Sequence, residues 1–276
     1  MINNFILDHI KVLKSHKFAY PEMELRALLN NCSKSRKDII FSNFNLNQID
    51  HGLFNSSFKR RLDKEPIAKI FKKKGFWKYE FFVNNNVLDP RPETELIIEE
   101  IIKKYKNKNK FLKIADLGTG SGCLAISLAK EFKNSNILAT DISSSAIEVA
   151  KINAKKFSVE NRIQFERSNW IKSIQIFDII TSNPPYLSFN EYNKVSNDIK
   201  LYEPKIALVG GNDGLDCYRQ IATKLKKITD NNSLCFFEIG INQKNECINI
   251  FKQNSMKCLE IIKDYQNIER ILVFKK

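Results

Sequence analysis

The segment Leu112-Lys113-Ile114-Ala115-Asp116-Leu117-Gly118-Thr119-Gly120-Ser121-Gly122 places an apolar run directly before a glycine-rich loop. A short apolar run that ends at glycine is typical of a buried strand. Glycine lets the backbone turn tightly and lets a ligand approach it without a Cβ in the way. The spacing is Gly-x-Gly-x-Gly, because Cys123 stands where a dinucleotide fingerprint requires glycine. The segment therefore predicts a strand, a loop and a helix that together bind a nucleoside lacking a diphosphate.

Strand and helix patterns alternate from residue 93 onward. The predicted strands are 112–117, 137–141, 163–166, 176–182, 234–238, 258–262 and 270–274. The predicted helices are 93–104, 122–132, 144–157, 214–228 and 244–253. This alternation predicts an α/β fold, Rossmann-like, with a seven-stranded and mostly parallel sheet that helices cover on both faces. Ligands of such folds bind at the carboxyl ends of the strands.

The first third of the chain has a different texture. Residues 1–75 carry apolar residues at helical spacing and almost no glycine, which predicts a small helical bundle. Residues 76–92 are rich in aromatic and β-branched residues around a run of asparagines, and we expect them to form a β-hairpin that links the bundle to the next domain. The α/β domain is then expected to occupy residues 93–276.

A second motif follows one of the predicted strands. The tetrapeptide Asn183-Pro184-Pro185-Tyr186 comes directly after the apolar run 176–182. The Asn183 side-chain oxygen and the Pro184 carbonyl can accept the two hydrogens of a planar amide or amino nitrogen and hold it in line for attack. The prolines fix the backbone, and Tyr186 offers a ring face for stacking. We therefore predict that these four residues bind the substrate nitrogen and catalyse its methylation.

The glycine loop and the tetrapeptide together predict a site for S-adenosylmethionine. Asp116, at the end of the first strand, would orient the loop or bind the methionine ammonium group. Asp141 closes the next strand and can accept hydrogen bonds from ribose hydroxyls, or alternatively support the helix that begins with three serines. Asn169 and Trp170 are expected to contact adenine, with a core tryptophan as the alternative. The predicted cofactor-binding residues are Asp116, Gly118, Thr119, Gly120, Ser121, Gly122, Asp141, Asn169, Trp170 and Asn183.

Composition limits the remaining possibilities. The six cysteines form no Cys-x-x-Cys pair, so we expect reduced thiols and no metal site. No apolar stretch is long enough to span a bilayer and the first residues lack a signal-peptide pattern, so we expect a cytoplasmic protein. The net charge of +14 permits binding to nucleic acid, but lysine scattered over solvated faces accounts for it equally well. Nothing in the sequence requires more than a monomer.

Beyond these two motifs, the chain resembles the peptide chain release factor glutamine methyltransferases (the PrmC/HemK family) over essentially its whole length. The matching pieces are Glu65–Ala68, Pro90–Glu95, Asp116–Gly122, Asn183–Tyr186, Glu203-Pro204 with Ala207-Leu208, Gly210–Leu215, Glu238-x-Gly240 with Gln243, and Asp264 with Arg270. Pro90-Arg91-Pro92-Glu93-Thr94-Glu95 and the stretch from Glu203 to Leu215 are the more specific pieces. Family members often carry aspartate where this chain has Asn169, and small apolar residues where it has Cys123.

The resemblance implies a class I methyltransferase that uses S-adenosylmethionine. It implies methylation of the side-chain nitrogen of the glutamine in the Gly-Gly-Gln motif of class I release factors, and an N-terminal domain that docks the factor. It also suggests that Arg91 and Glu93 lie over the substrate channel and contact the substrate. The alternative for these two residues is a rigid linker followed by acidic residues that favour the next helix N-terminus.

Two other functions compete with this interpretation. An amino-methyltransferase acting on adenine or cytosine in nucleic acid would use the same tetrapeptide, but no segment is left over for a target-recognition domain. A binding protein that keeps the fold without catalysis would be expected to have lost the glycine loop or Asn183, and this chain keeps both.

Overall fold

The computed structural model describes residues 4–35 and 38–276, which form two compact units that divide between Lys72 and Lys73. The predicted helical bundle also spans residues 1–3 and 36–37, which lie outside the described residues. The unit boundary precedes the predicted end of the bundle at residue 75, because Lys73, Lys74 and Gly75 pair with the next strand. Each unit has its own apolar core.

The first unit is helical. Its elements are α1 (Asn4–Ser15), α2 (Pro21–Asn31), η1 (Phe41–Asn43), η2 (Leu46–Gln48), α3 (His51–Leu62) and α4 (Ile67–Phe71). Residues at three- and four-residue spacing on α1 and α2 are buried, among them Ile6, Ile10 and Leu13, and they pack together as helical periodicity predicts. Arg61 donates two hydrogen bonds of 2.8 Å to the carboxylate of Glu24, which joins α3 to α2.

The second unit begins with a short β-hairpin. Strand β1 (Lys73–Phe76) pairs antiparallel with β2 (Tyr79–Phe82), and Trp77 and Lys78 form the turn. The predicted hairpin over 76–92 is therefore wrong in its position. The lysines of β1 are solvent-accessible, so that strand lacks the apolar signal that we used to find strands. Residues 83–91 contain no strand.

A seven-stranded sheet organises the rest of the second unit, as predicted. Its strands are β3 (Lys113–Leu117), β4 (Asn136–Asp141), β5 (Ile163–Arg167), β6 (Ile179–Ser182), β7 (Leu234–Glu238), β8 (Lys257–Lys263) and β9 (Glu269–Lys275). The order across the sheet is β5-β4-β3-β6-β7-β9-β8; the first five strands are parallel, and β9 is antiparallel to both of its neighbours, β7 and β8. After β5 the chain crosses to the other side of β3 and forms β6, so the strand order reverses between the adjacent strands β3 and β6. Ligands of such sheets bind at this point.

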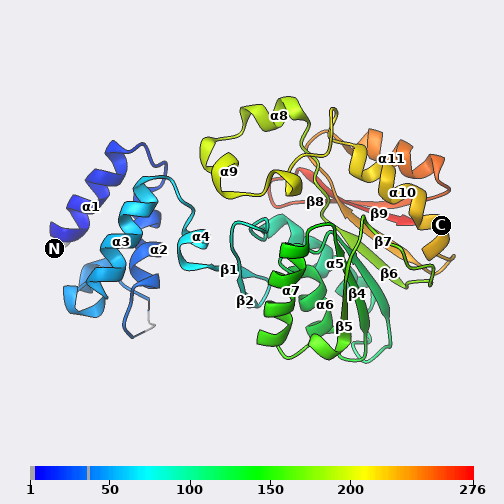
Figure 1. Ribbon diagram of the computed structural model, residues 1–276, viewed down its shortest axis with the longest axis horizontal. Helices are drawn as coiled ribbons and strands as arrows, with labels where there is room; N and C mark the ends of the chain where they lie inside the picture. Colours follow the sequence, from blue (N-terminus) through cyan, green and yellow to red (C-terminus); the bar gives the residue numbers. More distant parts are fainter. Residues whose placement is uncertain (1–3, 36–37) are drawn as a thin grey trace. The chain divides into compact units, whose positions relative to one another are not determined.

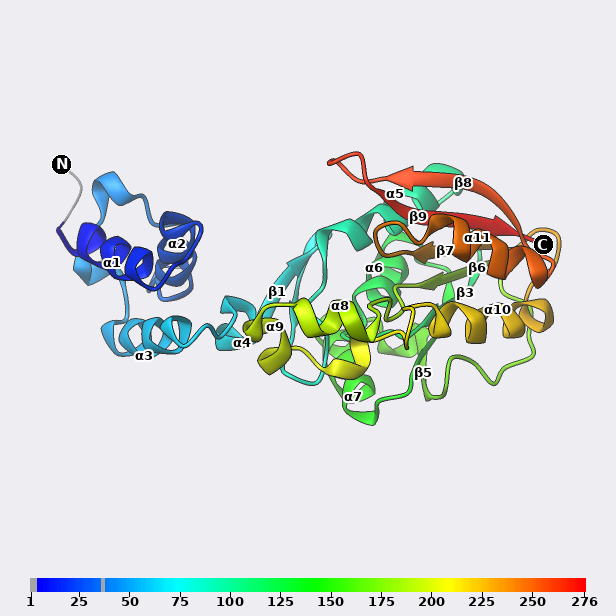
Figure 2. The same cartoon turned by 90° about the horizontal axis from the view of Figure 1, so that it is seen from above.

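Helices cover both faces of this sheet (Figure 1). The 3-10 turn η3 (Pro92–Thr94) leads into α5 (Glu95–Lys104), which covers one face together with α6 (Cys123–Glu131) and α7 (Ser144–Lys156). The other face is covered by α10 (Asp216–Ile228) and α11 (Lys244–Gln253), as the second view also shows (Figure 2). Alternate residues of β3 enter the two cores: Ile114 lies in the first and Ala115 in the second. Four short helical elements complete the unit: η4 (Glu160–Arg162) before β5, and α8 (Phe189–Lys194), α9 (Asn197–Tyr202) and η5 (Lys205–Ala207) between β6 and α10.

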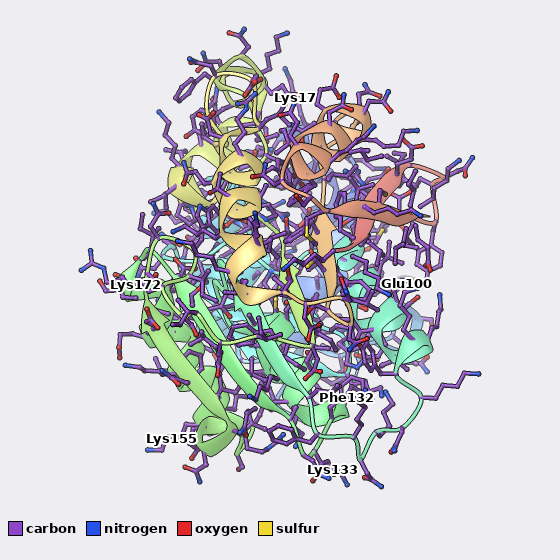
Figure 3. The ribbon with its side chains drawn as sticks, turned by 90° about the vertical axis from the view of Figure 1, so that its right-hand side faces the viewer. Lys17, Glu100, Phe132, Lys133, Lys155 and Lys172 are labelled. Atoms are coloured by element: carbon purple, nitrogen blue, oxygen red, sulfur yellow. The ribbon has the colours of Figure 1, made fainter. Side chains whose placement is uncertain are left out.

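The exposed lysines of the second unit are dispersed. Lys133 follows α6, Lys155 lies on α7 and Lys172 lies in the loop after β5, and each extends outward from a different part of the surface (Figure 3). These positions favour the interpretation of lysine as a general feature of solvated faces. Within residues 4–35 and 38–276, no helix is both long and apolar enough to cross a membrane.

Candidate active site

A cavity of about 240 Å³ opens at the carboxyl ends of the parallel strands. It gathers residues from the loops after β3, β4, β5 and β6 and from the segment before α5. The predicted site residues that line it are Arg91, Asp116, Gly118, Thr119, Gly120, Ser121, Asp141, Asn169, Trp170, Asn183 and Pro185. Glu93, Gly122, Pro184 and Tyr186 do not line it. The topology thus brings most of the predicted residues around a single cavity.

The glycine loop is held by backbone hydrogen bonds to the neighbouring strand. The N–H groups of Gly118 and Thr119 both donate to the carbonyl of Thr140, at 2.9 and 2.8 Å. Gly118 and Gly120 have positive φ angles of 75° and 55°, which residues with a Cβ adopt at a cost. A Cβ on Gly120 would project into open space, so glycine there keeps the cavity side of the loop clear.

Gly122 serves packing rather than lining the cavity. It has a φ of 80° and precedes α6, and a Cβ there would lie 2.9 Å from Cδ1 of Ile126 and 3.1 Å from Cβ of Ala150. Both distances are shorter than an ordinary van der Waals contact. Glycine at this position therefore allows α6 and α7 to approach each other just behind the loop.

Two acidic side chains, Asp116 and Asp141, hold the glycine loop through hydrogen bonds. Asp116 is buried and accepts hydrogen bonds from the hydroxyls of Thr119 (2.7 Å) and Thr181 (3.0 Å). Burial raises the pKa of Asp116 to about 6, against the opposing effect of these bonds. One carboxylate oxygen of Asp141 accepts from the N–H of Gly120 and the other from the N–H of Ser143, each at 2.9 Å.

Asp141 supports the start of α7 and also lines the cavity. The N-cap of α7 is Ser143, whose hydroxyl accepts from the N–H of Ala146, so Asp141 supports this helix start without capping it. Burial raises the pKa of Asp141, against the effect of the N–H groups of Ser143 and Gly120. Each carboxylate oxygen retains a lone pair, so Asp141 can still accept hydrogen bonds at the cavity wall.

Trp170 lies against the glycine loop. Its ring is the nearest neighbour of a Cβ built on Gly118, at 3.5 Å, and its indole N–H donates to the side-chain oxygen of Gln220 on α10 at 2.9 Å. Trp170 has a φ of 63° and is only half-buried. Its neighbour Asn169 is exposed and borders the cavity. Trp170 thus contributes to the core and lines the cavity.

Asn183 directly follows β6, and its side chain is fixed by a neighbour far away in the sequence. The amide nitrogen of Asn183 donates to the hydroxyl of Thr94 at 2.9 Å. The hydroxyl of Thr94 in turn donates to the carboxylate of Glu238, at the end of β7, at 2.5 Å. With its nitrogen held in this way, Asn183 keeps its side-chain oxygen as a hydrogen-bond acceptor at the cavity.

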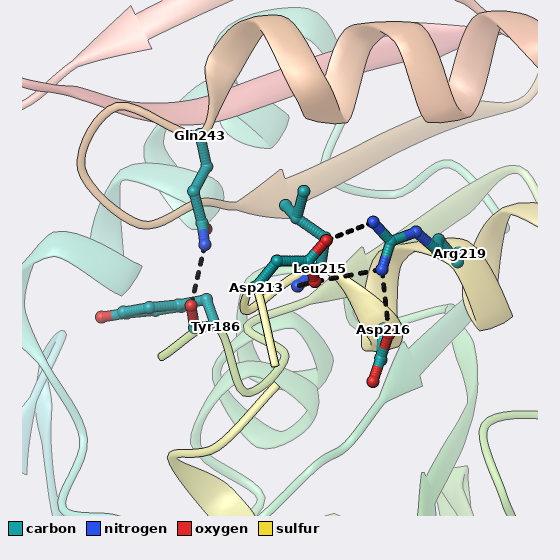
Figure 4. Close-up of polar contacts among 6 residues, drawn as sticks. All are labelled: Tyr186, Asp213, Leu215, Asp216, Arg219 and Gln243. Atoms are coloured by element: carbon teal, nitrogen blue, oxygen red, sulfur yellow. Dashed lines mark hydrogen bonds and ion pairs between the residues drawn. The ribbon is translucent and has the colours of Figure 1, made fainter. Parts of the chain in front are cut away.

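The backbone after Asn183 rests on a glycine turn and on Gln243. The side-chain nitrogen of Gln243 donates to the carbonyl of Tyr186 at 2.8 Å (Figure 4). Its side-chain oxygen accepts from the N–H of Gly240 at 3.0 Å. A Cβ on Gly214 would lie 2.3 Å from the same Tyr186 carbonyl, and one on Gly210 would lie 2.5 Å from the carbonyl of Pro185. Only glycine permits this approach.

Ion pairs stabilise the turn that contains Gly214. Arg219 on α10 forms ion pairs with both Asp213 and Asp216, as Figure 4 shows. The Arg219 guanidinium holds the pKa of Asp213 down, at about 2. The sequence pieces 210–215 and 243 thus converge on the backbone of the tetrapeptide.

Arg91 and Glu93 have different surroundings. Arg91 lines the cavity and donates to the carboxylate of Glu203 at 3.0 Å. Glu203 is buried and also accepts from the N–H of Asp89 at 3.3 Å, which ties the segment before α5 to the end of α9. Glu93 lies within the turn η3 and outside the cavity lining. Burial raises the pKa of the Glu238 carboxyl to about 7, and the charge of Glu93 adds to the rise.

Sequence reasoning missed three side chains that shape the site: Thr94, Glu238 and Asn153. Asn153 on α7 is fully buried, and its amide donates to the carbonyl of Ser121 at 2.9 Å. The same side chain accepts from the N–H of Phe82 at 2.7 Å and donates to the carbonyl of Phe82 at 2.9 Å. It therefore ties strand β2 to the glycine loop. The signal available in the sequence was a polar residue on the apolar side of a predicted helix.

Within the part of the chain that the structure describes, no group of three or more His, Cys, Asp or Glu side chains could hold a metal ion. Cys123 and Cys217 line the cavity, and burial raises the pKa of both thiols. They are therefore protonated near neutral pH and poor nucleophiles.

Comparison with known proteins identifies a matching family and relatives of this chain. The methyltransferase small domain family matches residues 86–200. A release factor glutamine methyltransferase of Buchnera aphidicola subsp. Schizaphis graminum is 38% identical over 100% of this chain and 99% of its own length. A bifunctional methyltransferase of Rickettsia conorii is 35% identical over 99% of this chain and 57% of its own length. The chain thus spans only about half the length of the rickettsial relatives it matches.

Solved structures support the fold. A methyltransferase from Pyrococcus furiosus aligns with a TM-score of 0.53 at 18% identity, over 80% of this chain and 98% of that one. At this level of identity the likeness concerns the fold of the α/β unit and not its substrate.

Proposed function

This chain belongs to the release factor glutamine methyltransferase family, and on that premise we propose that it methylates the side-chain nitrogen of a glutamine with S-adenosylmethionine as donor. The observation that carries the proposal is the position of Asn183. Its side chain borders the same cavity as the glycine loop, and its amide nitrogen is held by Thr94 so that its oxygen remains an acceptor.

The residues around the cavity fit S-adenosylmethionine. Gly118 and Gly120 leave the loop free of side chains, so the backbone can approach the methionine and ribose groups. Asp141 offers carboxylate lone pairs for ribose hydroxyls at the end of β4, and Trp170 offers an indole ring near Asn169 for adenine. Asp116 is positioned to hold the loop, because both of its oxygens accept threonine hydroxyls.

The residues of this chain contribute to the reaction by positioning the substrate nitrogen. S-adenosylmethionine, when bound, supplies a methyl group attached to a positively charged sulfur. The oxygen of Asn183 and the carbonyl of Pro184 would accept the two hydrogens of the substrate amide and aim its nitrogen at that methyl group. The nitrogen–carbon bond forms as the carbon–sulfur bond breaks, and one hydrogen of the nitrogen leaves as a proton to water. The products are the methylated glutamine and S-adenosylhomocysteine.

Tyr186 lies outside the cavity lining but directly follows Pro185, which is part of it, and would contribute a ring against which the flat amide lies. Burial raises the pKa of the Tyr186 hydroxyl to about 12, with the charge of Glu238 adding to the rise, so the ring stays neutral at working pH. Arg91 borders the cavity and is the better placed of the two predicted substrate contacts, because Glu93 lies outside the lining.

The substrate that we propose is the glutamine of the Gly-Gly-Gln motif in class I peptide chain release factors. The relatives from Buchnera and Clostridium acetobutylicum are named for glutamine methylation of release factors, and the former aligns with this chain end to end. We also propose that the helical unit before Lys73 contacts the factor, that the enzyme acts as a monomer in the cytoplasm, and that it needs neither nucleic acid nor a membrane.

The test is transfer of a radioactive methyl group from S-adenosylmethionine to three acceptors in parallel: a class I release factor, duplex DNA and total RNA. We expect label in the release factor alone with the wild-type enzyme. Asn183→Ala should lower the rate by about a hundredfold or more, because it removes a hydrogen-bond acceptor aimed at the reacting nitrogen. Label in DNA or RNA but not in the factor would replace the proposed substrate with a nucleic-acid base.

A further inference from the structure

We propose that Thr94 and Glu238 are positioning residues, which act through Asn183 by fixing which end of its amide faces the substrate. The inference rests on the proposed function and identifies how the acceptor for the substrate nitrogen is oriented. It starts from a chain of two hydrogen bonds, from the nitrogen of Asn183 to the hydroxyl of Thr94 and from that hydroxyl to the carboxylate of Glu238.

The direction of these bonds follows from the chemistry of the groups. A hydroxyl carries one hydrogen, and the ionised carboxylate of Glu238, the form present above its pKa of about 7, can only accept. When the hydrogen of Thr94 points at Glu238, its oxygen can only accept from Asn183. The amide of Asn183 must then place its nitrogen at Thr94, and its oxygen is left for the substrate.

The opposite orientation of Asn183 would not support the reaction. A flipped side chain would present its own N–H₂ group to the substrate amide, whose nitrogen carries two hydrogens and a delocalised lone pair. Two donors would then face each other, and the nitrogen would have no partner to draw it toward the methyl group. The correct orientation of one side-chain amide is therefore a condition for turnover.

The fold brings the three groups together from distant parts of the chain. Asn183 follows β6 directly, and Glu238 ends the neighbouring strand β7, where Ser182 pairs with Phe237 in register. Thr94 ends the turn η3, so its hydroxyl reaches both residues from the helix that begins beside them. Thr94 is 3% and Glu238 1% exposed, so water does not compete for these bonds.

Stability alone gives no reason for an acidic group at this position. Burial of a carboxyl in a protein interior costs free energy, and an apolar residue of similar size would avoid that cost. Burial raises the pKa of Glu238 to about 7; the nearby Glu93 adds to the rise, and the bond from Thr94 and the charges of Arg270 and Arg91 oppose it. Such a group is typical of a functional site.

The experiment compares Thr94→Val, Thr94→Ser and the control Thr229→Val. Valine replaces the hydroxyl of threonine by a methyl group, whereas serine keeps the hydroxyl. Thr229 is also buried and donates its hydroxyl to a backbone carbonyl of α10, that of Leu225, and it does not line the cavity. The measurements are kcat and KM for methylation of a class I release factor, the dissociation constant for S-adenosylmethionine and the midpoint of thermal unfolding.

We expect Thr94→Val to lower kcat by about tenfold to a hundredfold, because the acceptor is misplaced at the reacting atoms. Its dissociation constant for S-adenosylmethionine should stay within about twofold, since the glycine loop, Asp141 and Trp170 keep their proposed contacts to the cofactor. Thr94→Ser should recover most of the lost turnover, and Thr229→Val should leave kcat unchanged. A folded Thr94→Val enzyme with normal kcat, or serine and valine variants that are equally impaired, would overturn the inference.

A second measurement decides the inference even if no release factor is methylated. NMR can follow hydrogen exchange of the Asn183 side-chain amide, with its signals assigned by comparison with Asn183→Asp. We expect exchange in Thr94→Val to be about tenfold faster than in wild-type, as the loss of one hydrogen bond implies, and Thr94→Ser to resemble wild-type. Equal exchange in all three proteins would show that Thr94 does not hold the amide. Absent methylation with the expected exchange pattern would overturn the proposed substrate and keep the positioning of Asn183.

Discussion

Asn153→Ala is expected to destabilise the α/β unit by about 3 kcal/mol, because it removes three buried hydrogen bonds that each contribute about 1 kcal/mol. The wild-type side chain is fully buried on α7 and bonds to the N–H and carbonyl of Phe82 and to the carbonyl of Ser121. For a domain of this size the loss corresponds to a decrease in the midpoint of thermal unfolding of about 6–12 °C.

The assay is urea unfolding followed by tryptophan fluorescence. The two tryptophans of the sequence, Trp77 and Trp170, both lie in the unit that contains Asn153, so the signal reports on that unit. The control is Asn249→Ala, which truncates an exposed asparagine on α11 and should change the free energy of unfolding by less than about 0.5 kcal/mol.

The variant should also bind S-adenosylmethionine more weakly, because Ser121 lines the cavity and loses its tie to α7. A free-energy loss below about 1 kcal/mol would refute the reasoning, since it would mean that the three bonds contribute less than a single typical one. A full loss of stability with unchanged affinity would show that Asn153 supports the hairpin but not the glycine loop.

Three further variants test separate parts of the site. Asp141→Ala should raise the dissociation constant for S-adenosylmethionine about tenfold to a hundredfold by calorimetry, because a charged acceptor at the cavity and the bond to Gly120 are both lost; unchanged affinity would limit Asp141 to supporting the helix start. Tyr186→Phe should keep kcat within a few-fold, because the proposed contact is made by the ring; a severe loss would show that the hydroxyl participates. The stability of Glu238→Gln relative to wild-type should rise by about 2.5 kcal/mol from pH 5 to pH 8, measured by urea unfolding at both values. The folded-state pKa of Glu238 is raised from 4.5 to about 7, so its contribution is fully present below 4.5 and is lost as the pH rises through 7, whereas glutamine does not titrate; parallel pH profiles for the two proteins would contradict this.

The α/β fold could be predicted from the sequence because most of its strands and helices show a pattern in adjacent residues. Most of the parallel strands contain a short apolar run, and β7 and α11 begin and end where the pattern placed them. The hairpin at residues 73–82 was predicted too far along the chain because its first strand begins with Lys73, Lys74 and Gly75, whose pairing depends on β2 rather than on apolar character. The short helices α8 and α9 bury too little apolar surface to show a period, and no residue of either is fully buried.

The residues of the candidate site fall into two groups in the same way: local motifs predicted some of them, and only the fold brings the others together. The glycine loop and Asn183 were recognisable as motifs whose chemistry is contained in a few adjacent residues. Thr94 contacts Asn183 across 89 positions of sequence and Glu238 across 144, so no local pattern could join them. Gly122 looked like part of a ligand loop from its spacing, and only the packing of α6 on α7 shows what excludes its Cβ.

The measurement that tests the central claim most directly is peptide mass spectrometry of a class I release factor after incubation with this enzyme and S-adenosylmethionine. The factor is compared with a control whose Gly-Gly-Gln glutamine is replaced by asparagine. We predict one added methyl group, assigned by fragmentation to the side chain of that glutamine and absent from the control. A methyl group on another residue, or an unmodified factor despite demonstrated binding of S-adenosylmethionine, would contradict the claim that the oxygen of Asn183 receives this glutamine.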